Sequence, residues 1–140
     1  GGFFLRVLGL DYGDSRIGVA VSDIMGITAQ PVTVISEKNF PRQVELVAER
    51  AKELCAEEIV IGMPKNMNGT VGERGEKTKK FACALKEKLP LPVIYWDERL
   101  TTQAAHRALE EGQVSGKKRK GLLDKLAAVF ILQGYLDSKN

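Results

Sequence analysis

The stretch that most constrains the fold runs from Val7 to Asp23 and reads VLGLDYGDSRIGVAVSD. It continues an apolar segment, Phe3 to Leu10, which predicts a central strand covered on both faces. After a polar turn containing Gly13, Ile or Val alternates with Gly, Ala or Ser, which predicts a second strand from Arg16 to Ser22 with one face of small residues. We expect another element to pack closely against that small face. Asp11 then ends the first strand, either as a turn aspartate or as part of a site that needs partner acids elsewhere.

The length and the apolar segments favour one α/β domain. The chain has 140 residues, enough for a core without disulfide or metal staples, and we expect a single domain over residues 3–138, with residues 1–2 as a cloning remnant. No stretch resembles a signal peptide, and the apolar runs are too short to span a bilayer. We therefore expect a cytoplasmic protein without a membrane partner.

The cysteines and the histidine exclude several site classes. Cys55 and Cys83 lack the CxxC spacing of zinc or redox sites, and each falls on an expected helix beside apolar residues, so we expect reduced core thiols. His106 is the only histidine, which excludes histidine-based zinc sites, and we expect it on the surface of a helix.

Basic residues gather near the C-terminal third of the chain. The net charge of +3, from 21 basic and 18 acidic residues, is too small to indicate a polyanionic partner by itself. Lys117, Lys118, Arg119 and Lys120, however, form a run after Gly112 and Gly116, where the backbone can be mobile. This run is either a solvated loop or a phosphate-binding segment.

The rest of the chain alternates between short apolar strands and helices with apolar stripes. Asn39 is a suitable N-cap and Pro41 suits the first turn of the helix that follows. In order, we expect a strand at Pro31–Ser36 that completes an antiparallel meander, a helix after Asn39, a strand at Glu58–Met63, a helix at Glu76–Leu89, a strand at Val93–Trp96, and helices at Thr101–Glu111 and Gly121–Leu136.

An exposed loop rich in Asn and Gly follows the strand at Glu58–Met63. In open α/β sheets, loops at the carboxyl ends of strands border the ligand crevice. Lys65, Asn66 and Asn68 are therefore candidates for substrate contact, although a plain connection explains the composition equally well.

Two further acids stand where a partner of Asp11 would be expected. The strand at Val93–Trp96 runs directly into Asp97 and Glu98. Because adjacent strand residues point to opposite faces, we expect only one of them to face the site, and we prefer Glu98. Asp124 begins the apolar stripe of the last helix, where burying a carboxylate is costly unless it is paired or binds a cation. Alternatively, Asp124 is an acid at the start of the helix that is stabilised by the helix dipole.

An acid set without histidine or cysteine favours Mg²⁺ or Mn²⁺. Carboxylates of this kind can hold two ions about 4 Å apart, one activating water and the other stabilising the leaving oxygen of a phosphodiester. The sequence thus predicts hydrolytic phosphoryl transfer at Asp11, Glu98 and Asp124.

Four motifs resemble the YqgF family, also called RuvX or Holliday junction resolvase-like proteins, and the resemblance extends from Leu5 to Leu136. The motifs are LGLDYGDSRIGVAVSD at 8–23, IVIGMPKNMNG at 59–69, DERLTT at 97–102 and KKRKGLLDKLAAVFILQGYL at 117–136. The resemblance implies a ribonuclease H-like fold, here a mixed five-stranded sheet flanked by helices. It also implies a metal-dependent nuclease, first proposed as a Holliday junction resolvase and later associated with maturing the 5′ end of pre-16S rRNA.

The family's acidic positions carry over onto Asp11, Glu98 and Asp124. Within DERLTT, Arg99 and Thr101 are candidate phosphate contacts, although Arg99 is also placed to pair with a neighbouring acid. The basic run at 117–120 precedes the helix that carries Asp124, so phosphates bound there would lie near the metals.

The substrate and the oligomeric state stay open at this point. The partner is expected to be nucleic acid, either precursor rRNA or branched DNA, and the chain a monomer or a homodimer, since symmetric cutting of a junction needs two sites. Two alternatives are a non-catalytic ribosome-assembly or nucleic-acid-binding factor and an actin-like phosphotransferase. The second is disfavoured because the chain has the length of only one half of such a protein.

Overall fold

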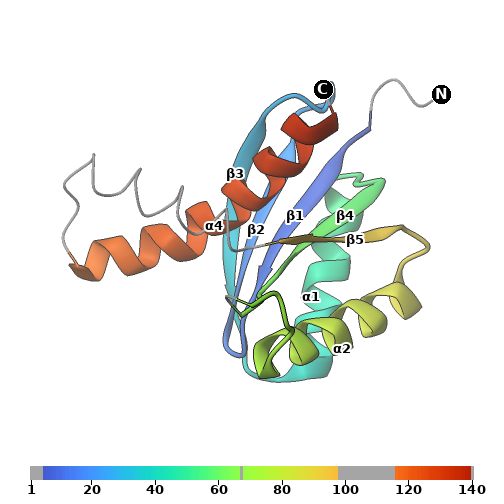
Figure 1. The fold of residues 1–140 in the computed structure, drawn as a ribbon. Helices are drawn as coiled ribbons and strands as arrows, with labels where there is room; N and C mark the ends of the chain where they lie inside the picture. Colours follow the sequence, from blue (N-terminus) through green and yellow to red (C-terminus); the bar gives the residue numbers. More distant parts are fainter. Residues whose placement is uncertain (1–4, 67, 98–115, 140) are drawn as a thin grey trace.

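A mixed five-stranded sheet organises the molecule, as expected from the sequence. The computed structural model describes residues 5–66, 68–97 and 116–139, with side chains from residue 126 onward in the last segment. The strand order is β3-β2-β1-β4-β5; β2 is antiparallel to both of its neighbours, whereas β1, β4 and β5 run parallel (Figure 1). The strands are β1 (Val7–Tyr12), β2 (Arg16–Ser22), β3 (Ala29–Ser36), β4 (Glu58–Met63) and β5 (Val93–Asp97), and the helices are α1 (Phe40–Glu53), α2 (Glu73–Lys88) and α4 (Gly116–Lys139).

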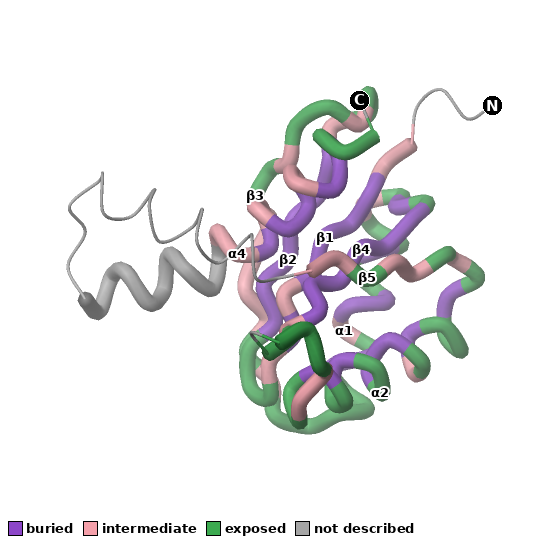
Figure 2. The backbone as a smooth tube through the Cα atoms, in the orientation of Figure 1, coloured by how far each residue is buried: buried purple, intermediate pink, exposed green. Residues whose placement is uncertain are grey.

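The two faces of the sheet carry separate cores. Leu8 and Leu10 of β1 point toward α1 and α2, and the alternate residue Val7 points toward α4. Figure 2 shows the resulting buried strands in the centre of the molecule, with exposed backbone around them. Because both faces are covered, β1 and β4 are apolar almost throughout, which explains why their sequences lack alternation.

Close packing of α4 explains the small residues of the first two strands. Ala20 of β2 lies in the core cluster beneath α4. A Cβ atom added to Gly9 of β1 would lie only 2.7 Å from the Cβ of Leu132 and 3.2 Å from the carbonyl oxygen of Ala128. The prediction that another element packs tightly against the small face is therefore confirmed, and that element is α4.

The start of α1 confirms the expected capping signals. The Asn39 side chain accepts a hydrogen bond from the Arg42 amide at 2.9 Å, and Pro41 occupies the first turn.

The prediction that both cysteines are core thiols is wrong, since Cys55 and Cys83 are exposed. The helix α1 ends at Glu53, so Cys55 no longer follows its apolar stripe and instead adopts a left-handed conformation with φ of 54°. Cys83 follows the buried Ala82, and the step of about 100° between adjacent helical residues turns it toward solvent.

The prediction that the basic run forms a loop is also wrong, because α4 begins at Gly116 and includes residues 117–120 in its first turns.

Other element bounds also differ from the expected ones. The helix α2 begins at Glu73, three residues earlier than expected, and the first strand extends through Asp11 to Tyr12. The expected helix at 101–111, with His106, lies outside the described residues. Within the described ranges, no helix is both long and apolar enough to cross a membrane.

Candidate active site

The carboxyl ends of three parallel strands meet at one edge of the sheet. β1 delivers Asp11 there, β4 ends at Met63 before the loop with Lys65 and Asn66, and β5 ends at Asp97. The two strand ends that the sequence marks as acidic, at Asp11 and at Asp97, thus lie at the same edge of the sheet.

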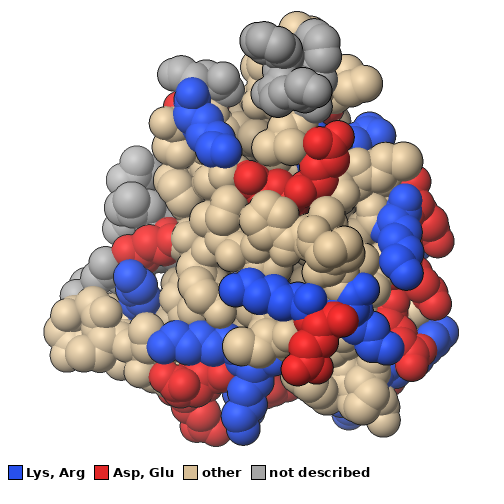
Figure 3. All heavy atoms as spheres, turned by 90° about the vertical axis from the view of Figure 1, so that its right-hand side faces the viewer, with Lys and Arg blue, Asp and Glu red and all other residues tan. Residues whose placement is uncertain are grey.

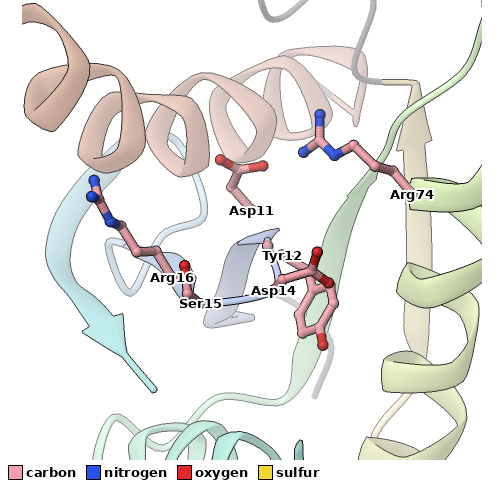
Figure 4. Close-up of a pocket in the computed structure, with 7 residues that line it drawn as sticks. Asp11, Tyr12, Asp14, Ser15, Arg16 and Arg74 are labelled. Atoms are coloured by element: carbon pink, nitrogen blue, oxygen red, sulfur yellow. The ribbon is translucent and has the colours of Figure 1, made fainter. Parts of the chain in front are cut away.

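Asp11 opens into a pocket of about 230 Å³ between the end of β1 and α4. Its Oδ1 atom is buried, and Figure 4 shows the carboxylate directed toward α4, with the guanidinium groups of Arg16 and Arg74 on either side. The pocket thus combines one inward-facing carboxylate with two cations. Its lining consists of Asp11, Tyr12, Gly13, Asp14, Ser15, Arg16 and Arg74.

A buried glutamine fixes the turn that follows Asp11. Gln43 of α1, which is 1% exposed, donates from Nε2 to the carbonyl oxygens of Asp14 at 2.9 Å and Glu37 at 2.6 Å. Its Oε1 accepts from the Tyr12 hydroxyl at 2.9 Å. Burial raises the pKa of the Tyr12 phenol, and the Asp14 carboxylate raises it further, so Tyr12 remains a donor at neutral pH. Gln43 therefore fixes the turn on the side of α1, and the other side of the turn lines the Asp11 pocket.

Arg74 is a candidate that sequence reasoning missed. It occupies the first turn of α2, and its guanidinium has no carboxylate partner among the residues that the structure describes. Because the sequence pattern started this helix at Glu76, Arg74 counted only as part of a loop. Arg16 lies at the start of β2, where the sequence pattern indicates only a strand. The one usable signal for Arg74 is its position between Gly72 and Gly75, at the end of the loop that follows a strand.

The backbone of Asp124 lies at the level of Asp11. Tyr135 of α4 hydrogen-bonds Glu58 at the start of β4, so α4 runs antiparallel to β1. Gly9 faces the segment between Ala128 and Leu132. From Gly9 to Asp11 the strand advances by about 7 Å, and a helix covers this distance in four to five residues. Because α4 runs the opposite way, the helix residues level with Asp11 precede the contact with Gly9 by four to five positions. They belong to the turn that contains Asp124, whose side chain lies outside the described part.

Asp97 belongs to the opposite face of the sheet from Asp11. Trp96 packs on α4, with its ring 6.1 Å from that of Tyr135 in an edge-to-face arrangement. By the two-residue period, Asp97 points the other way. Glu98, Arg99 and Thr101 lie outside the described residues. Among the side chains that are described, no three of the metal-ligating types come together.

The loop after β4 borders an adjoining hollow. Lys65 and Asn66 line it together with Arg74, which therefore contacts both hollows. The Asn66 side chain donates to the Thr70 hydroxyl at 3.0 Å, and Asn68 accepts from the same hydroxyl at 2.6 Å. Asn66 and Asn68 thus shape the loop, whereas Lys65 extends from an exposed position.

Solved structures share this architecture. Thermus thermophilus RuvC matches with a TM-score of 0.61 at 16% identity, covering 96% of each chain. The fowlpox virus Holliday junction resolvase matches with a TM-score of 0.57 at 16% identity, covering 96% of this chain and 99% of the other. RuvC resolvases have a ribonuclease H-like fold, so the expected fold class is confirmed.

Sequence comparison identifies the family within that fold. The family model described as RuvX, Holliday junction resolvase, matches residues 5–138, and the chain belongs to this family. A relative from Clostridium novyi is 54% identical over 134 residues, covering 96% of this chain and 99% of the relative. Another from Caldanaerobacter subterraneus is 52% identical over 136 residues, with 96% and 98% covered. Both carry the name "Putative pre-16S rRNA nuclease".

Proposed function

We propose that this protein hydrolyses phosphodiester bonds in structured nucleic acid, using a metal site built around Asp11. One observation carries the proposal: at the shared edge of three parallel strands, Asp11 points into a pocket beneath α4 with Arg16 and Arg74 at its sides. A carboxylate for a cation and two guanidinium groups for phosphate oxygens form a suitable set for phosphoryl transfer.

The donor set of the site fits Mg²⁺ or Mn²⁺, because Asp11 offers a partly buried, all-oxygen ligand. We propose Asp11, Glu98 and Asp124 as the residues that hold the metal and carry catalysis. When bound in pairs, such ions activate a water molecule and stabilise the leaving oxygen. The level of Asp124 opposite Asp11 supports its assignment.

The preference for Glu98 over Asp97 gains support from β5. Trp96 faces α4, so Asp97 faces away from the Asp11 pocket. This orientation disfavours Asp97 as the metal ligand.

The protein's own cations would bind and orient the substrate. Arg74 and Arg16 reach the pocket from opposite sides, so they are suited to bind two oxygens of one phosphate group. The remaining proposed contacts are Lys65, Asn66, Arg99, Thr101, Lys117, Lys118, Arg119 and Lys120.

The names of the relatives favour pre-16S rRNA as substrate. We propose its 5′ end as the position of cleavage, by a monomer or a homodimer. The family description favours a four-way DNA junction as the second candidate, and symmetric cutting there requires a homodimer. A nuclease of ribosomal precursors acts where ribosomes assemble, so we place the protein in the cytoplasm.

The test compares cleavage of a pre-16S rRNA 5′ leader and of a four-way DNA junction at fixed salt, with Mg²⁺ or Mn²⁺, by wild type and Asp11→Asn. We expect one substrate to be cut at defined positions, and the cut to disappear in Asp11→Asn or with a chelator. Binding of both substrates without cleavage of either would instead support a non-catalytic assembly factor.

A further inference from the structure

A second hollow continues from the Asp11 pocket toward α1. This hollow, here called the Phe40 groove, has a volume of about 280 Å³, and its lining includes Tyr12, Asp14, Lys38, Phe40, Lys77 and Lys80. A smaller hollow between them shares Arg74 with the Asp11 pocket and Lys77 with the Phe40 groove. The three hollows therefore form a continuous path over the turn after β1.

An exposed aromatic ring lies in the Phe40 groove. Phe40 is 39% exposed, although most large apolar side chains in the described part of the chain are buried. Its inner edge is supported, because Phe40 contacts Phe81 edge to face at 6.2 Å and Phe81 stacks on Tyr12 at 4.4 Å. The ring is thus held in place by a fixed aromatic stack while part of it faces solvent.

The charge of the Phe40 groove is predominantly positive. Three lysines and one aspartate line it, and the Asp14 carboxylate is engaged by Lys77 at 3.2 Å. Lys38 and Lys80 make no ion pair with any residue that the structure describes. The nearby Glu37 carboxylate accepts hydrogen bonds from the amides of Lys38 and Asn39. Two lysines that line the groove with Phe40 thus remain available for phosphates.

We propose that the Phe40 groove binds an unpaired nucleotide of the substrate adjacent to the bond cut in the Asp11 pocket. Its base stacks on Phe40, and Lys38 and Lys80 bind the flanking phosphates. Aromatic platforms between cations are the usual means of binding single-stranded nucleic acid, and they accept any base. This inference rests on the proposed nuclease function and adds a requirement for a single-stranded flank beside the cleavage position.

The test measures binding in the Asp11→Asn background, so that no substrate is consumed. Fluorescence anisotropy compares an RNA duplex that carries a short single-stranded oligopyrimidine extension with the same duplex lacking it. We expect Phe40→Leu to weaken binding of the extended duplex roughly tenfold, since leucine retains apolar bulk but lacks a stacking face. Binding of the blunt duplex stays unchanged, and Phe40→Trp retains the preference for the extension.

The lysines are tested by their salt dependence. Replacing both Lys38 and Lys80 by Gln should lower the slope of log affinity against log salt by about 1.4 for the extended duplex, at about 0.7 for each single-strand phosphate. Lys79→Gln is the matched control, because Lys79 precedes Lys80 on α2 but pairs with Glu76 at 3.6 Å, and its slope should not change.

Equal losses for both duplexes, or no loss in Phe40→Leu, would overturn the groove assignment. Thermal unfolding of each variant excludes a general loss of folding as the cause. If wild type cuts a substrate but Phe40→Leu binds normally, the result refutes only the nucleotide-binding role of the Phe40 groove. If binding depends on Phe40 but no metal-dependent cut occurs, the result refutes only the nuclease function.

Discussion

At the scale of single residues, the turn after Asp11 depends on one buried amide. Gln43 satisfies two carbonyl oxygens and the Tyr12 hydroxyl at once, and no other described side chain bonds these three groups together. Replacing Gln43 by Met keeps the side-chain length but removes the partner of the buried Tyr12 hydroxyl and of two part-buried carbonyl oxygens. We expect the free energy of unfolding to fall by about 2–4 kcal/mol.

Chemical denaturation of Gln43→Met measures this loss, and Gln30→Met is the matched control because Gln30 is exposed on β3. Its stability should change by less than about 0.5 kcal/mol. Similar losses in both variants would show that the hydrogen-bond network around the turn adds nothing to stability.

The contact between Gly9 and α4 allows a second prediction at this scale. Gly9→Ala places a methyl group 2.7 Å from the Leu132 Cβ, so helix or strand must shift. We expect a loss of about 1–3 kcal/mol in unfolding free energy. Gly72→Ala is the control, since its added Cβ would meet only the Asn66 side chain at 3.5 Å. A smaller loss in Gly9→Ala than in Gly72→Ala would contradict the close packing of α4.

At the scale of elements, α4 connects the sheet to the basic run. Its C-terminal half covers β1 and β2, and its first turns, with residues 117–120, extend beyond the sheet (Figure 1). Because these residues lie in the first turns of α4, the binding role proposed for them belongs to this helix rather than to a loop.

Neutralising Lys117, Lys118, Arg119 and Lys120 to Gln should weaken binding of all nucleic acids alike. It should also reduce the salt slope by up to about 3, if each cation contacts a phosphate. Lys86→Gln with Lys88→Gln is the control, because these lysines lie in the last turn of α2, remote from the site. An unchanged slope in the fourfold variant removes the run from the binding surface.

The connection between β2 and β3 predicts a dependence on pH. Backbone amides of Ile27 and Thr28 donate to Asp23 at 2.7 and 3.2 Å and lower the pKa of its carboxyl below the usual 3.8. A lowered folded-state pKa means that this stabilisation is complete above pH 3.8 and is lost as the pH falls through the folded-state value. Melting temperatures of wild type and Asp23→Ala should differ at neutral pH and converge in acid. A difference in melting temperature that stays constant with pH would show that ionisation of Asp23 does not contribute to stability.

At the scale of the whole molecule, charge is mixed rather than concentrated. Figure 3 shows basic and acidic side chains interspersed over the face that it presents. Exposed ion pairs also form along α1 and α2. A net charge of +3 does not direct nucleic acid to any particular face. Local groups, namely the Asp11 pocket, the Phe40 groove and the basic run, must therefore determine where it binds.

The sequence predicted what local periodicity and capping determine. β2, β4, the α1 cap and the small face of β2, which includes Ala20, all follow from patterns within one element. Arg74 and the Phe40 groove could not be predicted, because they depend on how α1 and α2 meet the turn after β1. Cys55 was misplaced since periodicity does not mark where a helix ends.

If Asp11 holds a divalent cation, as we propose, calorimetric titration of Mn²⁺ will detect the binding. Wild type should bind saturably, Asp11→Asn should bind at least about tenfold more weakly, and Asp14→Asn, whose carboxylate is exposed and paired with Lys77, should retain its affinity. Equal affinity in wild type and Asp11→Asn would contradict the account.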